Sequence, residues 1–117
     1  MSFRAVVLTS VILTLSSSVA WSRHPYLLGS GNRPCGDWTT ERRGKTDRSY
    51  EFAQWVLGYV TAVNIYVLQH DDDVTKGTDN EDLLAWVDNY CGAHPLDKIE
   101  DAAEELLKVL TKKSGAQ

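Results

Sequence analysis

The stretch that decides the fold is DRSYEFAQWVLGYVTAVNIYVLQ, residues 47–69. Its apolar side chains recur with the period of an α-helix, in two parallel rows. The first row contains Phe52, Val56, Tyr59, Val63 and Tyr66, and the second contains Ala53, Val60 and Val67. Because these rows leave little of the circumference polar, we expect this helix to be the central one of a bundle. Gly58 costs about 1 kcal/mol relative to alanine in mid-helix, so we expect another backbone to approach closely there.

Shorter helical segments are predicted on both sides of this stretch. Residues 36–41 predict a short helical turn, followed by a polar linker at residues 42–46. Downstream, Thr78 and Glu81 match a capping box, a hydroxyl followed three residues later by a carboxylate, so a helix should begin there. The inner side of that helix should carry Leu83, Leu84, Val87, Tyr90 and Cys91.

The last helix is expected after Gly92, which permits a break. Pro95 suits a first turn, and Asp97 and Glu100 match a second capping box. The helix should reach about residue 112, with lysines at its negative end. The side chains that it should bury are Leu96, Ile99, Ala103, Leu106 and Leu110.

These elements predict an all-α fold class. No alternating strand pattern and no internal repeat competes with them. We expect a small four-helix-type bundle over residues 35–113, closed by one disulfide, with a tail at residues 114–117. Residues 21–34 hold several prolines and glycines without a sustained period, so an irregular or mobile N-terminal arm is expected there, with order beginning near Cys35.

Residues 1–20 have the pattern of a signal peptide. Arg4 supplies a positive charge, and residues 5–15 form the apolar run AVVLTSVILTL, too short for a hydrocarbon core of roughly 30 Å. Small residues follow, so we expect cleavage after Ala20 and export to the periplasm. An uncleaved anchor helix is the alternative. No other stretch is long and apolar enough for stable membrane insertion.

The chain has two cysteines, Cys35 and Cys91. In an oxidising compartment an even pair is most simply one disulfide. It would close a loop of about 57 residues and stabilise the fold by roughly 4 kcal/mol in the chain-entropy model. The alternative is a reactive thiolate at Cys91, paired with the imidazole of His94.

No constellation of residues predicts an active site, a cofactor or a metal. The histidines His24, His70 and His94 lie in three different segments, which disfavours a zinc site. The acidic stretch HDDDVTKGTDN, residues 70–80, fails as a calcium loop because Lys76 stands where an EF-hand needs glycine. We therefore expect a protein that is not an enzyme.

The charge balance disfavours a nucleic-acid partner. The formal net charge is −4, and losing Arg4 with residues 1–20 brings it near −5. No basic stripe could replace the counterions along a phosphate backbone. A short basic cluster does occur, and it is either a solvated surface or a patch that meets an acidic partner. Its members are Arg42, Arg43, Lys45 and Arg48.

Aromatic side chains are frequent for so small a chain. Trp38, Trp55 and Trp86 are expected mainly in the core. The alternative is that one of them, with Tyr59 or Tyr66, forms an exposed anchor for another protein, because such residues dominate binding energies at interfaces.

Three segments carry a family resemblance: CGDW at residues 35–38, WVLGYVTAVN at residues 55–64 and WVDNYCGAHPLDKIEDAAEELL at residues 86–107. Together they resemble the Tai/Rap group of immunity proteins over nearly all of the chain after residue 20. The resemblance implies a small periplasmic helical protein, often a homodimer, that occludes a peptidoglycan amidase effector of a type VI secretion system. It also implies that Cys35 and Cys91 form the structural disulfide.

The tyrosine–cysteine pair followed by Pro95 and an amphipathic helix is also similar to the HdeA/HdeB acid-stress chaperones. That likeness implies the same compartment and a single disulfide. Protonation of many of the 16 carboxylates would then loosen packing and expose apolar surface for clients. The cysteine spacing and the tryptophan–glycine central helix look less like this second family.

No motif of either family identifies the residues that touch a partner. The acidic loop between two predicted helices is our candidate, because of its charge density and its position. Its candidate partner-binding residues are Asp71, Asp72, Asp73 and Asp79. A solvated loop without a partner is the alternative.

Overall fold

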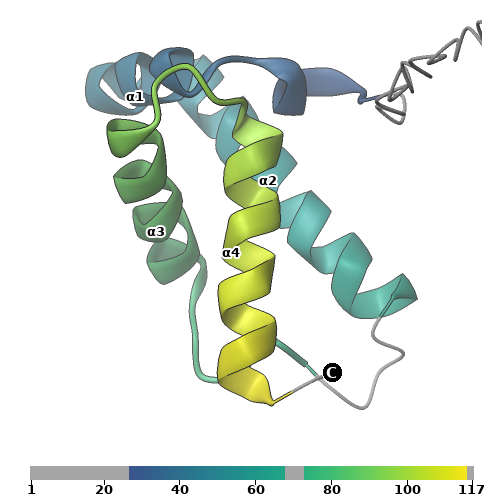
Figure 1. The fold of residues 1–117 in the computed structure, drawn as a ribbon. Helices are drawn as coiled ribbons and strands as arrows, with labels where there is room; N and C mark the ends of the chain where they lie inside the picture. The colour runs from purple at the N-terminus through teal and green to yellow at the C-terminus, as the bar shows by residue number, and fades with distance from the viewer. Residues whose placement is uncertain (1–26, 68–72, 116–117) are drawn as a thin grey trace, which may run out of the picture.

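The computed structural model describes residues 27–67 and 73–115 (Figure 1). Within these residues the chain forms one short 3₁₀ helix and four α-helices, which confirms the predicted all-α class. The elements are η1 (Gly29–Asn32), α1 (Cys35–Gly44), α2 (Asp47–Tyr66), α3 (Asn80–Ala93) and α4 (Ile99–Ser114). The predicted signal peptide at residues 1–20 with its cleavage site, His24, His70, Asp71 and Asp72 lie outside the described residues.

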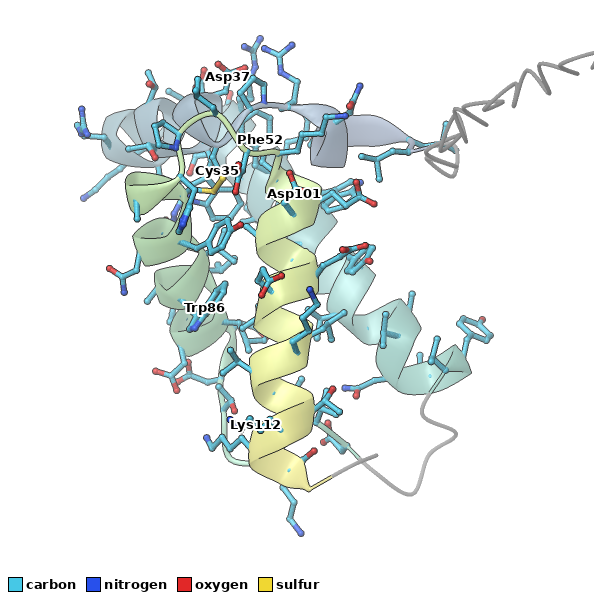
Figure 2. All side chains as sticks on the ribbon, in the orientation of Figure 1. Cys35, Asp37, Phe52, Trp86, Asp101 and Lys112 are labelled. Carbon is cyan, nitrogen blue, oxygen red and sulfur yellow. A yellow bond between two sulfur atoms is a disulfide. The ribbon has the colours of Figure 1, made fainter. Side chains whose placement is uncertain are left out.

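Helix α2 begins at Asp47, as predicted, because the hydroxyl of Thr46 accepts a hydrogen bond from the backbone N–H of Ser49. Its first half enters the core through Phe52, Val56 and other apolar side chains (Figure 2). Its last turns diverge from α4 (Figure 1). The expectation that the whole helix is covered on several sides is therefore wrong for its C-terminal end.

The predicted close approach at Gly58 is wrong. A Cβ atom built there would meet no heavy atom within 4 Å. The glycine lies on the solvent side of α2, and its cost to the helix is not offset by packing.

Helix α1 is longer than predicted, since residues 42–44 of the expected linker continue it as far as Gly44. Trp38 holds it to the rest of the fold, because its side chain is fully buried among the core residues. The helix stops after Gly44 because the next residue, Lys45, adopts a left-handed conformation with φ of 51°. The extension through residues 42–44 is stabilised by Arg42, which donates two hydrogen bonds to Asp88 on α3.

Residues 27–34 are part of the packed fold, so the expected irregular or mobile arm is wrong for them. The indole N–H of Trp55 donates to the carbonyl of Leu28 at 2.8 Å, and the hydroxyl of Ser30 donates to Glu51 at 2.9 Å. A Cβ atom on Gly31 would lie 2.1 Å from the ring of Trp55. The glycine is therefore required for this close contact.

The helix starts of α3 and α4 are each one residue later than predicted. Asp79, not Thr78, caps α3, and it exchanges hydrogen bonds with Asp82 across the first turn. At α4 the backbone N–H of Lys98 donates to Asp101 at 2.7 Å, while the carboxylate of Asp97 turns to Tyr90.

The prediction that α4 buries Leu96 is also wrong. This side chain is 94 % exposed, because the helix begins only at Ile99. The inner face of α4 instead adds an alanine to the predicted set. Its buried residues are Ile99, Ala102, Ala103, Leu106 and Leu110.

The predicted disulfide is confirmed. Cys35 and Cys91 join the start of α1 to the last turn of α3, with their Cα atoms 4.7 Å apart and both residues fully buried (Figure 2). A second tie between these helices lies one to two turns further along α1, where Trp38 and Arg42 both donate to Asp88. Among the described residues, no helix has the length and hydropathy needed to cross a membrane.

Candidate functional site

The C-terminal end of α2 presents apolar side chains to solvent. Ile65 is 42 % exposed, Tyr66 is 80 % exposed and Val67 is 66 % exposed. They are consecutive, at the end of the helix that stands apart from α4 (Figure 1). Three large apolar side chains exposed at one helix end are candidates for an interaction surface, and tyrosine is among the side chains that dominate binding energies.

The acidic loop returns to this end of α2. The side-chain amide of Asn64 donates to a carboxylate oxygen of Asp73 at 3.1 Å, and its carbonyl oxygen accepts from the backbone N–H of Val74 at 3.3 Å. Val74 is buried in the core, which anchors residues 73–75 beside α2. We name the surface formed by residues 64–67 and 73–75 the α2 tip.

The carboxylate of Asp73 has a fixed position within the α2 tip. It accepts hydrogen bonds from the backbone N–H of Thr75 at 2.9 Å and from the Thr75 hydroxyl at 2.7 Å. These bonds, the hydroxyl first, lower the pKa of Asp73. The tip therefore combines a fixed negative charge with an exposed aromatic ring.

A hollow of about 270 Å³ lies beside these groups. Its walls are mainly polar and come from both α2 and the loop. The lining residues are Thr61, Asn64, Ile65, Asp73 and Thr75. The α2 tip can thus offer hydrogen-bonding groups next to the apolar side chains of Ile65 and Tyr66.

The predicted partner-binding aspartates divide between two roles in the described part of the chain. Asp73 belongs to the α2 tip, whereas the carboxylate of Asp79 caps α3 by accepting from the backbone N–H of Asp82 at 2.9 Å. Asp71 and Asp72 lie outside the described residues. Whether any of these aspartates binds a partner stays a prediction.

Sequence reasoning considered Tyr66 as an anchor but did not place it beside the acidic loop. It missed Asn64, Ile65 and Val67 as surface residues. The sequence did contain one signal, because the apolar rows run as far as Tyr66 and Val67, directly before the acidic stretch at residues 70–80. The hydrogen bonds of Asn64 join residues nine and ten positions apart, and only the fold shows them.

The disulfide leaves no thiol at Cys91, so the alternative of a reactive cysteine beside His94 is ruled out. The ring of His94 stacks on Tyr90 with centroids 4.3 Å apart, and its Nδ1 lies 2.9 Å from the Tyr90 carbonyl oxygen. The hydroxyl of Tyr90 donates to Asp97, which raises the pKa of Tyr90 to about 12. These contacts give His94 and Tyr90 a packing role at the end of α3.

Two of the tryptophans stack on tyrosines of their own helices. Trp55 stacks on Tyr59 with centroids 5.3 Å apart, and Trp86 stacks on Tyr90 at 5.5 Å. Both indoles are partly buried against the core, whereas Trp38 is fully buried. The prediction that these tryptophans lie in the core is thus confirmed fully for Trp38 and in part for Trp55 and Trp86.

In the stretches that the structure describes, no group of three histidine, cysteine, aspartate or glutamate residues is arranged to hold a metal ion. Comparison of the chain with protein-family models, with curated proteins and with solved structures gives no match.

Proposed function

We propose that this chain is a periplasmic binding protein without catalysis of its own, which occludes a peptidoglycan amidase effector of a type VI secretion system. The resemblance to the Tai/Rap immunity proteins supplies the class of partner. The observation that carries the proposal is the α2 tip, where Ile65, Tyr66 and Val67 are exposed beside the fixed carboxylate of Asp73.

The shape of the α2 tip suits entry into a cleft. Tyr66 is the last residue of α2, whose last turns diverge from α4 (Figure 1), and its side chain is exposed to a partner. Burying a tyrosine removes about 150–250 Å² of protein surface from water. Each Å² of apolar surface buried favours association by about 25 cal/mol. Since the ring is already 80 % exposed, nearly all of this area is available to a partner.

The α2 tip is also held in place before binding. Asn64 ties the loop to α2, and the buried side chain of Val74 ties the loop to the core. A surface ordered in advance loses little conformational entropy on association, which favours affinity. Occlusion by such a surface requires no bond-making step.

The direct test mixes the purified, oxidised protein with a type VI secretion peptidoglycan amidase, the one encoded next to its own gene where such a gene is present, and follows peptidoglycan cleavage. We expect stoichiometric inhibition and a stable complex on gel filtration. An amidase from an unrelated secretion cluster is the control and should stay active. Full cleavage at a molar excess of the protein, with no complex, would overturn the proposal.

One observation favours an acid-stress chaperone as a second candidate. The carboxylate of Asp88 receives hydrogen bonds from Trp38 and Arg42, so its protonation weakens a tie between α1 and α3. Acid could then expose the core around Trp38 to client proteins. Suppression of client aggregation near pH 2–3, with binding of a hydrophobic dye, would support this function, and a protein that stays folded and inert there would exclude it.

A further inference from the structure

We propose that a groove between α1, α2 and the start of α3 binds an acidic peptide segment with apolar side chains. The groove has a volume of about 720 Å³. It lies at the other end of α2 from the α2 tip, because 16 residues separate Tyr50 from Tyr66, about 24 Å along a helix. The inference goes beyond the proposed function, since both surfaces can be occupied together.

The basic cluster seen in the sequence divides into two pairs in the fold. Arg42 forms two hydrogen bonds of 2.8 Å with the carboxylate of Asp88, and Arg48 lies 3.6 Å from Glu41. Arg43 and Lys45 have no acidic partner within residues 27–67 and 73–115, and both line the groove. They are the positive charges left available to a ligand.

The remaining walls of the groove are apolar or nearly neutral. Ala53 and Leu84 are buried in its floor, and Leu57 is half-buried beside them. Tyr50 is 69 % exposed at the rim, where its ring can cover an apolar side chain. The groove therefore offers apolar contact on one side and positive charge on the other.

The other charged groups around the groove do not cancel its positive wall. The carboxylate of Asp88 is already paired with Arg42 and accepts from the indole of Trp38. Glu81 lines the groove from α3 and is exposed, and its single negative charge is outnumbered by the two positive charges of Arg43 and Lys45. Charge complementarity thus favours an acidic segment over a basic one.

The bound peptide would place a carboxylate between Arg43 and Lys45 and an apolar side chain against Leu57 and Tyr50. Both parts of the ligand are needed for this arrangement. A purely acidic peptide would lose the apolar contact, and a basic peptide would meet the cationic wall. Binding should weaken as salt increases, since the two cations are exposed.

The test uses the full oxidised protein and a fluorescein-labelled octapeptide of alternating glutamate and leucine, followed by fluorescence polarisation. We expect saturable binding of the peptide. Its affinity should fall about tenfold or more in the double variant Arg43→Gln, Lys45→Gln. The matched control is Lys112→Gln, Lys113→Gln, which removes the same charge at the far end of α4 (Figure 2). This control should bind like the unaltered protein.

Two further arms test the apolar part and the class of ligand. Tyr50→Ala should weaken binding about tenfold, while Tyr66→Ala should leave it unchanged. An equal loss of peptide affinity in both double variants would show that the peptide is attracted by the overall charge and not by the groove, and would overturn the proposal. Equal binding of a lysine–leucine octapeptide, or binding of anionic lipid vesicles without binding of the acidic peptide, would overturn it as well.

Discussion

The indole nitrogen of Trp38, on α1, donates a hydrogen bond of 2.7 Å to Oδ1 of Asp88, on α3. The same carboxylate accepts two hydrogen bonds from Arg42, whose guanidinium carbon lies 5.7 Å from the centre of the Trp38 ring. This cluster fixes α1 against α3 beside the disulfide. It also forms the inner wall of the groove that carries Arg43 and Lys45.

Replacing Asp88 by alanine should lower the free energy of unfolding by about 2 kcal/mol, because it leaves the buried indole N–H and the guanidinium without their acceptor. Urea unfolding measures this. The matched control is Asp37→Ala, which removes an aspartate paired with Arg33 at the surface, and it should cost about 0.5 kcal/mol or less. Equal losses in the two variants would contradict the proposed role of Asp88.

The free energy of unfolding should decrease in acid as the carboxylate of Asp88 becomes protonated. Burial raises the pKa of Asp88, but the hydrogen bonds from Arg42 and Trp38 outweigh it, so the folded pKa lies below the ordinary value. The stabilisation is therefore present above about pH 4, the pKa of the unfolded carboxyl, and is lost as pH falls through the folded pKa. In the variant Asp88→Asn the free energy of unfolding should decrease less steeply as the pH is lowered. An unchanged acid slope would exclude Asp88 as a source of it.

Gly31→Ala should destabilise the fold by about 1–3 kcal/mol, since the new Cβ atom would overlap the ring of Trp55. Gly58→Ala is the matched control. It should stabilise α2 by up to about 1 kcal/mol, because nothing lies within 4 Å of the added methyl group. Thermal unfolding of the two variants should therefore shift in opposite directions, and a neutral Gly31→Ala would contradict the packing of residues 27–34.

Removing the disulfide should cost about 4 kcal/mol in the chain-entropy model, because the bond joins residues 56 positions apart. The double variant Cys35→Ser, Cys91→Ser is compared with the oxidised protein in urea. Mass spectrometry of the unaltered protein should find the two cysteines joined. Two free thiols in folded protein purified from the cell envelope would contradict the assignment.

Sequence periodicity alone predicted the parts of the fold in which neighbours in the chain determine the structure. The apolar rows predicted a helix from Asp47, and the burial of Phe52 and Val56 follows from their spacing. The disulfide between Cys35 and Cys91 was also predicted, because the chain offers one pairing. All of these depend on residue type and interval.

The features that were missed depend on contacts across the fold. Residues 42–44 read as a linker, yet α1 continues because Arg42 reaches Asp88, 46 positions away. Residues 27–34 read as mobile, yet the indole of Trp55 holds Leu28 and covers Gly31. The α2 tip likewise requires the contact of Asn64 with Asp73, so the sequence suggested only the acidic loop itself.

The central claim is that the protein acts through the α2 tip. Calorimetric titration of the amidase from the inhibition test with the oxidised protein, Tyr66→Ala and Tyr50→Ala tests it most directly. Truncation of Tyr66 should weaken binding by about 2–4 kcal/mol, the loss typical of an aromatic anchor, while truncation of the similarly exposed Tyr50 should leave the affinity for the amidase unchanged. The same affinity for all three proteins, or a loss at Tyr50 alone, would contradict it.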